Sequence, residues 1–143
     1  MTRRTHRTER RRSERYRLDL PVRFRLYLAS RPDDSRTTFF PARLYDISRH
    51  GVSFLTDTVE HRGLHFFHPT VPFSEQCTVE VELPGTGEPI LVQGRIVWYD
   101  KAEPGSPCAF RAGLEWIDPP SSLAKDIKTL LRRGAGAPAP TES

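Results

Sequence analysis

The sequence has no apolar run approaching the roughly 20 residues that a helix needs to cross a bilayer, so membrane insertion is not expected. The arginines at its start have no apolar stretch behind them, which argues against a secretory signal. Cysteine is scarce, and both Cys77 and Cys108 fall in apolar, strand-like segments. Because free cysteine is usually buried, we expect two reduced core residues rather than a disulfide, in a cytoplasmic protein.

The chain also lacks the sequence patterns of common catalytic sites. It has no glycine-rich phosphate loop of the P-loop or dinucleotide-binding type. Ser48 has His50 nearby in sequence, but no nucleophile elbow or oxyanion-hole motif accompanies it. The carboxylates are scattered over strand positions that are predicted to face solvent. We therefore predict a binding protein rather than an enzyme.

Positive charge is concentrated at one end of the sequence. Residues 3–17 contain eight arginines and two glutamates, a net charge of +6, whereas the whole chain carries +4, so the residues after Arg17 sum to −2. A protein that follows a phosphate backbone usually spreads Lys and Arg over a folded face. General nucleic-acid binding is therefore the weaker expectation, and residues 1–8 are predicted to be a disordered basic leader.

Alternating apolar residues predict an all-β domain with one helix. In VRFRLYL (residues 22–28), apolar and polar side chains alternate with a period of two, which is typical of a half-buried strand. Further strands are predicted over about 39–47, 52–55, 77–83, 89–100 and 108–117, with loops at 30–38 and 59–76. Gly94 lies within the longest strand, where a glycine often marks a bend or bulge. Six antiparallel strands with short loops favour a closed barrel over an open sheet.

One helix is predicted to follow the barrel, over about residues 122–133. Ser121 or Ser122 can cap its start, and Gly134 suits its end. An apolar stripe is expected to face the barrel: Leu123, Ile127, Leu130 and Leu131. The remaining residues, 134–143, are predicted to be a disordered tail.

Two short patterns are candidates for a ligand site. Arg11 and Arg15 form Arg-x-x-x-Arg just before the first strand, and Asp46, Ser48 and Gly51 form Asp-x-Ser-x-x-Gly at the hairpin of the second and third strands. Each pattern alone has a plain explanation. An arginine-rich leader produces such a pair by chance, and an Asp and a Ser often cap a hairpin.

Together, the two patterns suit a ligand that has both phosphates and guanines. The planar fork of arginine binds phosphate through two parallel hydrogen bonds, and it can also reach O6 and N7 of guanine. Asp46 offers acceptors for the N1 and N2 hydrogens of guanine. Ser48 adds a hydroxyl beside backbone N–H groups, and Gly51 permits a positive φ, which suits a tight turn after Ser48.

At these residues the sequence closely resembles the PilZ family of bacterial cyclic-di-GMP receptors. The resemblance covers roughly Glu9 to Ile117 and includes ERRRSERYRLDLPVRF, LYDISRHGVSF and VQGRIVWYD…FRAGLEWID. It implies a PilZ domain over residues 9–133, built as a six-stranded antiparallel β-barrel (about 18–118) followed by the C-terminal α-helix.

The resemblance also implies roles for the motif residues. Arg11 and Arg15 are expected to grip the phosphates and guanines of cyclic-di-GMP, with Asp46 and Ser48 binding it from the barrel surface and Gly51 shaping the turn. The neighbouring Arg10 and Arg12 could share the arginine role.

The implied function is that of a receptor without a cofactor. Without ligand, the clustered arginines repel one another; binding of the anionic dinucleotide is expected to pin the leader over the barrel and so to signal through a protein partner. Motility, pili and exopolysaccharide synthesis are the outputs that the resemblance allows. Two alternatives stay open: a PilZ-like protein-interaction module that binds no nucleotide, and a nucleic-acid binder that uses the arginine-rich leader.

The segment 59–76 contains three histidines, His61, His65 and His68, whose spacing could suit a metal, but no Cys, Asp or Glu completes an evident site. No metal is therefore predicted. Three phenylalanines are instead expected to hold this segment against the barrel, with a partner-docking patch as the alternative: Phe66, Phe67 and Phe73.

Overall fold

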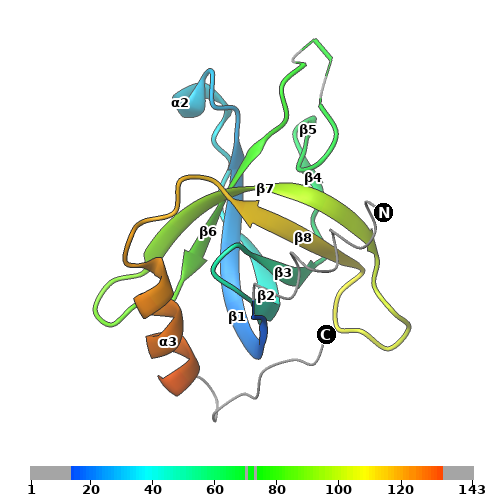
Figure 1. Cartoon of the computed structure of the whole chain (residues 1–143). Coiled ribbons are helices and arrows are strands. Elements are labelled where there is room, and N and C mark those ends of the chain that lie inside the picture. The colour runs from blue at the N-terminus through cyan, green and yellow to red at the C-terminus, as the bar shows by residue number, and fades with distance from the viewer. Residues whose placement is uncertain (1–13, 70, 73, 134–143) are drawn as a thin grey trace, which may run out of the picture.

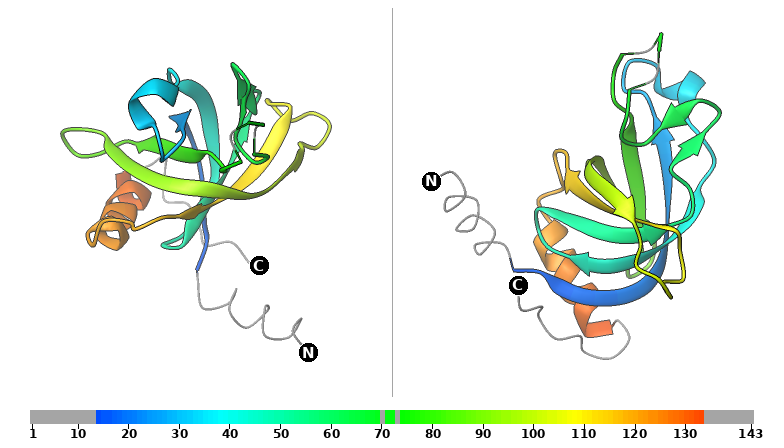
Figure 2. Two further views of the ribbon diagram at one scale, coloured as in Figure 1. Left: turned by 90° about the horizontal axis from the view of Figure 1, so that it is seen from above. Right: turned by 90° about the vertical axis from the view of Figure 1, so that its right-hand side faces the viewer.

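The structure is a computed structural model that describes residues 14–69, 71–72 and 74–133. Within these residues, six antiparallel strands close into a barrel in the order β1-β2-β3-β8-β7-β6 (Figures 1 and 2). The barrel strands are β1 (Tyr16–Tyr27), β2 (Phe40–Ile47), β3 (Gly51–Thr56), β6 (Thr78–Leu83), β7 (Ile90–Lys101) and β8 (Phe110–Trp116). The predicted fold class, a six-stranded antiparallel barrel followed by a helix, is confirmed.

The alternating pattern of each strand fills the barrel interior. In β1, Val22, Phe24 and Leu26 are buried, whereas Arg23 and Arg25 lie on the outer face. Burying a large apolar side chain contributes about 1.5–3 kcal/mol. A shift of one residue would expose the whole apolar set of a strand, so this pattern also fixes the strand register.

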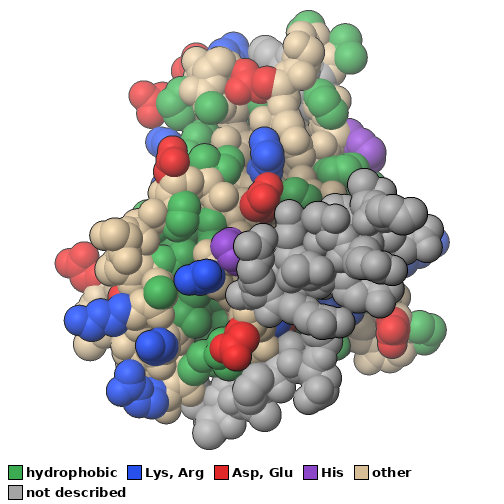
Figure 3. Space-filling view, viewed as in Figure 1, with side chains coloured by type: hydrophobic (Ala, Val, Ile, Leu, Met, Phe, Trp, Pro, Cys, Tyr) green, Lys and Arg blue, Asp and Glu red, His purple; other side chains and the backbone are tan. Residues whose placement is uncertain are grey.

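The C-terminal helix α3 (Leu123–Arg133) begins within one residue of its predicted start. It lies at the end of the barrel away from α2 and from β4 and β5 (Figures 1 and 2). Its apolar stripe belongs to the same core as the barrel interior, with three residues buried: Leu123, Ile127 and Leu130. Lys and Arg side chains cover its outer face (Figure 3).

Two segments that were expected to be loops contain short elements. Residues 30–38 include α2 (Pro32–Ser35), where the fixed φ of proline suits the first helical turn. Residues 59–76 include a two-stranded hairpin of β4 (Glu60–His61) and β5 (Leu64–His65). Its turn residues Arg62 and Gly63 both have positive φ, as in the tight turns that suit the twist of hairpins.

The residues that follow β5 are fixed to the barrel by aromatic packing. Phe66 is fully buried, and its ring centroid lies 5.5 Å from that of Tyr99 and 6.4 Å from that of Phe24. Phe67 is partly buried and also packs on Tyr99. The expectation for these two phenylalanines is confirmed, and Phe73 lies outside the described residues.

The expected bulge at Gly94 is wrong. The register between β7 and β8 shifts between Ile96 and Trp98, two residues further along the strand. Glycine is needed at position 94 for a different reason, because a Cβ there would lie 2.6 Å from the carbonyl oxygen of Glu115 on β8. The close approach of two strands explains this glycine.

The two cysteines differ more than was predicted. Both are free thiols, and Cys77 is a core residue whose burial raises the pKa of its thiol to about 11. Cys108 precedes β8 and is only partly buried, so its assignment to the core is wrong.

The predicted leader, residues 1–8, and the predicted tail, residues 134–143, lie outside the described residues. Among the helices that the structure describes, none has the length and apolar character to span a membrane.

Candidate functional site

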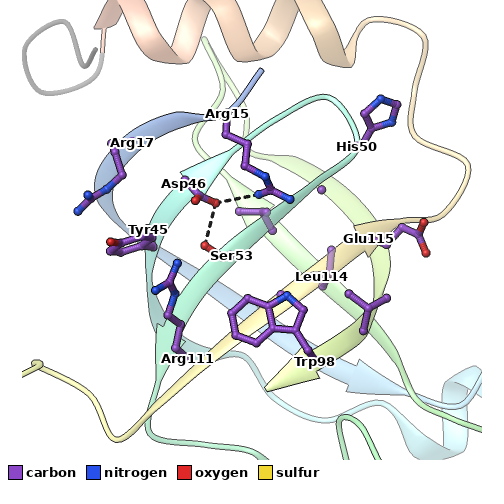
Figure 4. Close-up of a pocket in the computed structure, with 14 residues that line it drawn as sticks. Arg15, Arg17, Tyr45, Asp46, His50, Ser53, Trp98, Arg111, Leu114 and Glu115 are labelled. Atoms are coloured by element: carbon purple, nitrogen blue, oxygen red, sulfur yellow. Dashed lines mark hydrogen bonds and ion pairs between the residues drawn. The ribbon is translucent and has the colours of Figure 1, made fainter. Parts of the chain in front are cut away.

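A pocket of about 870 Å³ lies on the outer surface of the barrel, bordered by β2, β3, β7, β8 and the residues around the start of β1 (Figure 4). Its volume is in the upper part of the range of about 300–1,000 Å³ that is typical of small-molecule sites. Three of the predicted site residues line it: Arg15, Asp46 and Gly51. The barrel therefore brings Arg15 of the arginine motif together with Asp46 and Gly51 of the hairpin motif.

Arg15 and Asp46 are in direct contact inside this pocket. Arg15 Nη1 donates to Asp46 Oδ1 at 3.1 Å, and Ser53 Oγ donates to the same oxygen at 2.8 Å (Figure 4). The Asp46 residue is buried, whereas the Arg15 side chain is 37% exposed. The two donors fix the carboxylate at the pocket floor and leave the guanidinium accessible from solvent.

A β-bulge explains why Asp46 faces the pocket. The register between β2 and β3 shifts between Leu44 and Asp46, so Tyr45 is an extra residue on β2. Adjacent residues of a strand normally face opposite sides, but here Tyr45 and Asp46 both line the pocket. Leu44 and Ile47 stay buried. Their spacing of three residues, which breaks the period of two, is the sequence signal for this bulge.

Ser48 shapes the turn between β2 and β3. It is buried, its Oγ accepts a hydrogen bond from the His50 backbone N–H at 3.1 Å, and its own N–H donates to the Gly51 carbonyl at 2.9 Å. It is not one of the residues that line the pocket. Contact between Ser48 and a ligand therefore stays a prediction.

Gly51 lines the pocket but does not have the positive φ that was predicted for it. Among the described glycines, Gly63 and Gly105 are the ones with positive φ. Glycine is required at position 51 because a Cβ would lie 2.0 Å from the carbonyl oxygen of Leu114 on β8. Its role is to let β3 approach β8 closely beside the pocket.

Trp98 forms a wall of the pocket that was not singled out from the sequence. The bulge before Trp98 leaves both Val97 and Trp98 on the outer surface, 46% and 42% exposed. The indole lies over Gly113, where a Cβ would be 2.1 Å from Trp98 Nε1. The missing side chain at position 113 thus makes room for a partly exposed aromatic ring.

A second wall is formed by Arg17, Tyr45 and Arg111, which were also not singled out as site residues (Figure 4). The Cζ atoms of Arg17 and Arg111 each lie 3.9 Å from the centroid of the Tyr45 ring. All three residues occupy outer positions on their strands, which the alternating pattern indicates. Their proximity depends on the register of β1, β2, β3 and β8. No local sequence pattern predicts that register.

The remaining predicted arginines, Arg10, Arg11 and Arg12, lie outside the described residues, and their contact with a ligand stays a prediction. Arg15 is the member of the arginine motif that the structure places at the pocket.

The histidines of the segment after β3 have structural contacts. His65 Nδ1 accepts hydrogen bonds from the backbone N–H groups of Phe67 and His68, at 3.0 and 3.2 Å. Burial and the neighbouring His68 lower the pKa of His65, which favours the neutral ring that can accept these bonds. In the described part of the chain, no three His, Cys, Asp or Glu side chains are placed to hold a metal ion.

The pocket combines groups that bind oxyanions with groups that bind a flat ring. Guanidinium groups bind phosphate or the acceptor edge of guanine. The carboxylate of Asp46 accepts hydrogen bonds, and the exposed indole of Trp98 offers a surface for stacking. Such a set suits an anionic ligand that carries an aromatic base.

Two solved structures are similar to this chain, and the first of them supports the same fold. The structure titled PilZ domain with c-di-GMP of YcgR from Escherichia coli has a TM-score of 0.54 and 18% sequence identity, covering 86% of this chain and 89% of that chain. The structure of the Bacillus subtilis inhibitor of motility, MotI/DgrA, has a TM-score of 0.49 and 15% identity, covering 87% of this chain and 52% of that chain.

Comparison with protein families gives the assignment. No curated protein matches this sequence. The profile of the PilZ domain, however, matches residues 9–133, which is most of the chain and includes the whole described barrel and α3. The chain therefore belongs to the PilZ domain family.

Proposed function

We propose that this PilZ protein is a cyclic-di-GMP receptor rather than an enzyme, and that it signals to a protein partner when the nucleotide binds. The observation that carries the proposal is the contact between Arg15 and Asp46 in a pocket of about 870 Å³. An arginine fork and a fixed carboxylate side by side can bind the two chemical groups of this ligand, its phosphodiesters and its guanines.

Each group of the ligand has a proposed partner. Arg15, joined by Arg11 from the preceding segment, binds a phosphate oxygen or O6 and N7 of guanine, and the flanking Arg10 and Arg12 share this role as secondary contacts. Asp46 accepts from N1 and N2 of a guanine, which distinguishes guanine from adenine. Ser48 and Gly51 hold the turn that positions Asp46.

Ligand binding has to compete with a contact that already exists. Asp46 Oδ1 accepts hydrogen bonds from both Arg15 and Ser53 before any nucleotide is present. We propose that Arg15 turns from Asp46 to the ligand, and that the arginine-rich segment before it changes conformation with it. The surface around β2, β3 and β8 then differs between the two states, which gives a partner protein something to recognise.

Calorimetric titration with cyclic-di-GMP tests the proposal. Wild-type protein should bind, and Arg15→Ala should bind about ten- to a hundredfold more weakly, since a hydrogen bond to a charged group contributes about 1.5–3 kcal/mol. Arg23→Gln is a matched control: it also removes one arginine charge, but Arg23 lies further along, within β1, and does not line this pocket. It should bind like the wild type.

Selectivity tests the role of Asp46. Asp46→Asn should lower the preference for cyclic-di-GMP over cyclic-di-AMP, because one acceptor oxygen is replaced by a donor. Unchanged discrimination would show that Asp46 does not bind a guanine edge.

If the wild type gives neither heat nor a thermal shift with cyclic-di-GMP, the receptor proposal fails and the interaction module takes its place. Salt-sensitive binding of unrelated DNA that Asp46→Asn leaves intact would favour a nucleic-acid binder.

A further inference from the structure

Tyr45 is held between two guanidinium groups, and we call Arg17, Tyr45 and Arg111 the Tyr45 stack. The guanidinium carbons of both arginines lie 3.9 Å from the centroid of the Tyr45 ring. Figure 4 shows Arg17 and Arg111 on opposite sides of Tyr45. A cation over the face of an aromatic ring is attracted to it, so the contact stabilises each guanidinium in this position.

The two arginines of the Tyr45 stack have no carboxylate partner in the described residues. The ion pairs found there involve other arginines, including Arg15, Arg23 and Arg25. Arg111 Nε is moreover buried, and within the described part of the chain it has no hydrogen-bond partner. Buried donors nearly always have an acceptor, so this one indicates a site whose acceptor comes from outside these residues.

The Tyr45 stack shares its pocket with the contact between Arg15 and Asp46. The Arg111 guanidinium also lies 5.7 Å from the Trp98 ring, so it is placed between the two aromatic walls. A second hollow, of about 390 Å³, also borders the stack, and both hollows have carboxylates in their lining. In the larger pocket each carboxylate already has an arginine partner outside the stack, Arg15 for Asp46 and Arg95 for Glu115, whereas Glu103 of the second hollow is in none of the ion pairs among the described residues. An anion is therefore expected on the side of the larger pocket.

We propose that Arg17 and Arg111, held by Tyr45, form a second anion subsite that binds a phosphate group. Two planar forks fixed on one ring match the oxygens of a phosphate better than flexible lysines do, because less freedom is lost on binding. In the proposed receptor the phosphate is a phosphodiester of the cyclic dinucleotide, and in that form the inference rests on the proposed function. Arg15 and Asp46 are then left to recognise the base.

Calorimetry with two substitutions of Arg111 tests this subsite. Arg111→Gln removes the charge, and cyclic-di-GMP should bind it about ten- to a hundredfold more weakly than the wild type. Arg111→Lys keeps the charge but loses the planar fork, so its affinity should fall between the two. Arg23→Gln again serves as control, since Arg23 also stacks on an aromatic ring but has its own carboxylate partner.

The outcomes separate this inference from the proposed function. If the wild type binds and Arg111→Gln binds equally well, the second subsite is overturned while the receptor proposal stands. If the wild type does not bind cyclic-di-GMP, the receptor proposal fails, and titration with inorganic pyrophosphate then decides on the subsite. Binding of pyrophosphate that Arg111→Gln abolishes supports the subsite, and no binding by the wild type overturns it. Thermal melting checks that each variant is folded. If Arg111→Gln does not fold, the affinity of Arg111→Lys decides on the subsite.

Discussion

Strand β1 takes part in two stacks of arginine on an aromatic ring. The two stacks differ in whether their arginines are paired with carboxylates. Near its start is the Tyr45 stack, which lines the pocket. Near its end is the Phe39 stack, in which the Cζ atoms of Arg23 and Arg25 lie 4.5 and 4.6 Å from the centroid of the Phe39 ring. Within the described residues, the arginines of the Phe39 stack have carboxylate partners and those of the Tyr45 stack have none.

The partners of the Phe39 stack come from the neighbouring strand β6. Arg23 lies opposite Glu82 and Arg25 opposite Glu80 in the antiparallel register, and each pair has an N–O distance of 2.7 Å. Opposite charges at facing positions stabilise a sheet. The same motif of arginine on an aromatic ring is thus part of the scaffold where the chain supplies the acid. Where the described residues supply no acid, we propose that the motif binds an external anion.

The largest effect is expected from giving the Tyr45 stack an acid of its own. Trp98→Glu places a carboxylate near Arg111 and removes the indole surface, so cyclic-di-GMP affinity should fall by about a hundredfold or more. Trp98→Gln is the matched control, because it removes the indole without adding charge. Calorimetry on both variants isolates the charge effect, and an equal loss in the two would mean that the charge of the Tyr45 stack is irrelevant to binding.

Removing the arginine from the partly buried pair should reduce stability rather than binding. Glu80 is 8% exposed, so Arg25→Ala leaves a carboxylate with little access to water. The unfolding free energy should fall by about 1–3 kcal/mol, between the values for exposed and for fully buried pairs. Urea denaturation measures it.

The corresponding control in the other stack is Arg17→Ala, which leaves no carboxylate behind and should destabilise the fold less. Adding Glu80→Gln to Arg25→Ala should restore part of the loss, because the uncompensated charge is then gone. Equal destabilisation by Arg25→Ala and Arg17→Ala would contradict the distinction between the stacks.

A smaller loss of binding is expected when the wall beside the Tyr45 stack is displaced. In Gly113→Ala the new Cβ meets the indole of Trp98, since a Cβ at this position would lie 2.4 Å from Trp98 Cε2. The ring must shift, and cyclic-di-GMP affinity should fall by about tenfold or less, within the range of one stacking contact. Tryptophan fluorescence reports the shift itself. A changed spectrum with unaltered affinity would show that Trp98 does not contact the nucleotide.

The comparison of the two stacks also shows what the sequence could predict. Strand positions and the helix followed from periodicity, because a single apolar face specifies both the element and its burial. Arg23 and Arg25 were recognisable as outer residues in the same way. Their pairing with β6 was not, since it depends on how β1 closes against a strand that follows some 50 residues later in the chain.

The site was harder to predict than the fold for a related reason. Arg15 and Asp46 were singled out because they belong to motifs, and the structure places them in contact. Asp46 and Trp98 face the pocket only because β-bulges interrupt the alternation of β2 and β7. In the sequence, Arg111 is an ordinary outer residue of β8, and its contact with Tyr45 depends on the register of the barrel strands. Local patterns contain neither the bulge position nor the closure of the barrel.

The smallest effect is expected from titrating the exposed acid of the Phe39 stack. The hydrogen bond from Arg23 holds the pKa of Glu82 below its ordinary value. A carboxyl whose pKa is lower in the folded than in the unfolded state contributes stability above its ordinary value, about 4.3 for Glu, and loses it as the pH falls through the folded value. Acid should therefore leave Arg23 uncompensated, as the arginines of the Tyr45 stack already are at neutral pH in the described structure.

Glu82→Gln provides the reference for this titration, because it cannot lose a proton. At neutral pH the wild type should melt at a slightly higher temperature than Glu82→Gln, and the difference should disappear as the pH is lowered past the folded pKa of Glu82. Salt should also reduce the difference at neutral pH, since both groups are partly accessible to solvent. A difference that stays constant at every pH would mean that the pair is held by its stacking on Phe39 rather than by its charges. The two stacks would then differ in their geometry but not in the role that charge plays in them.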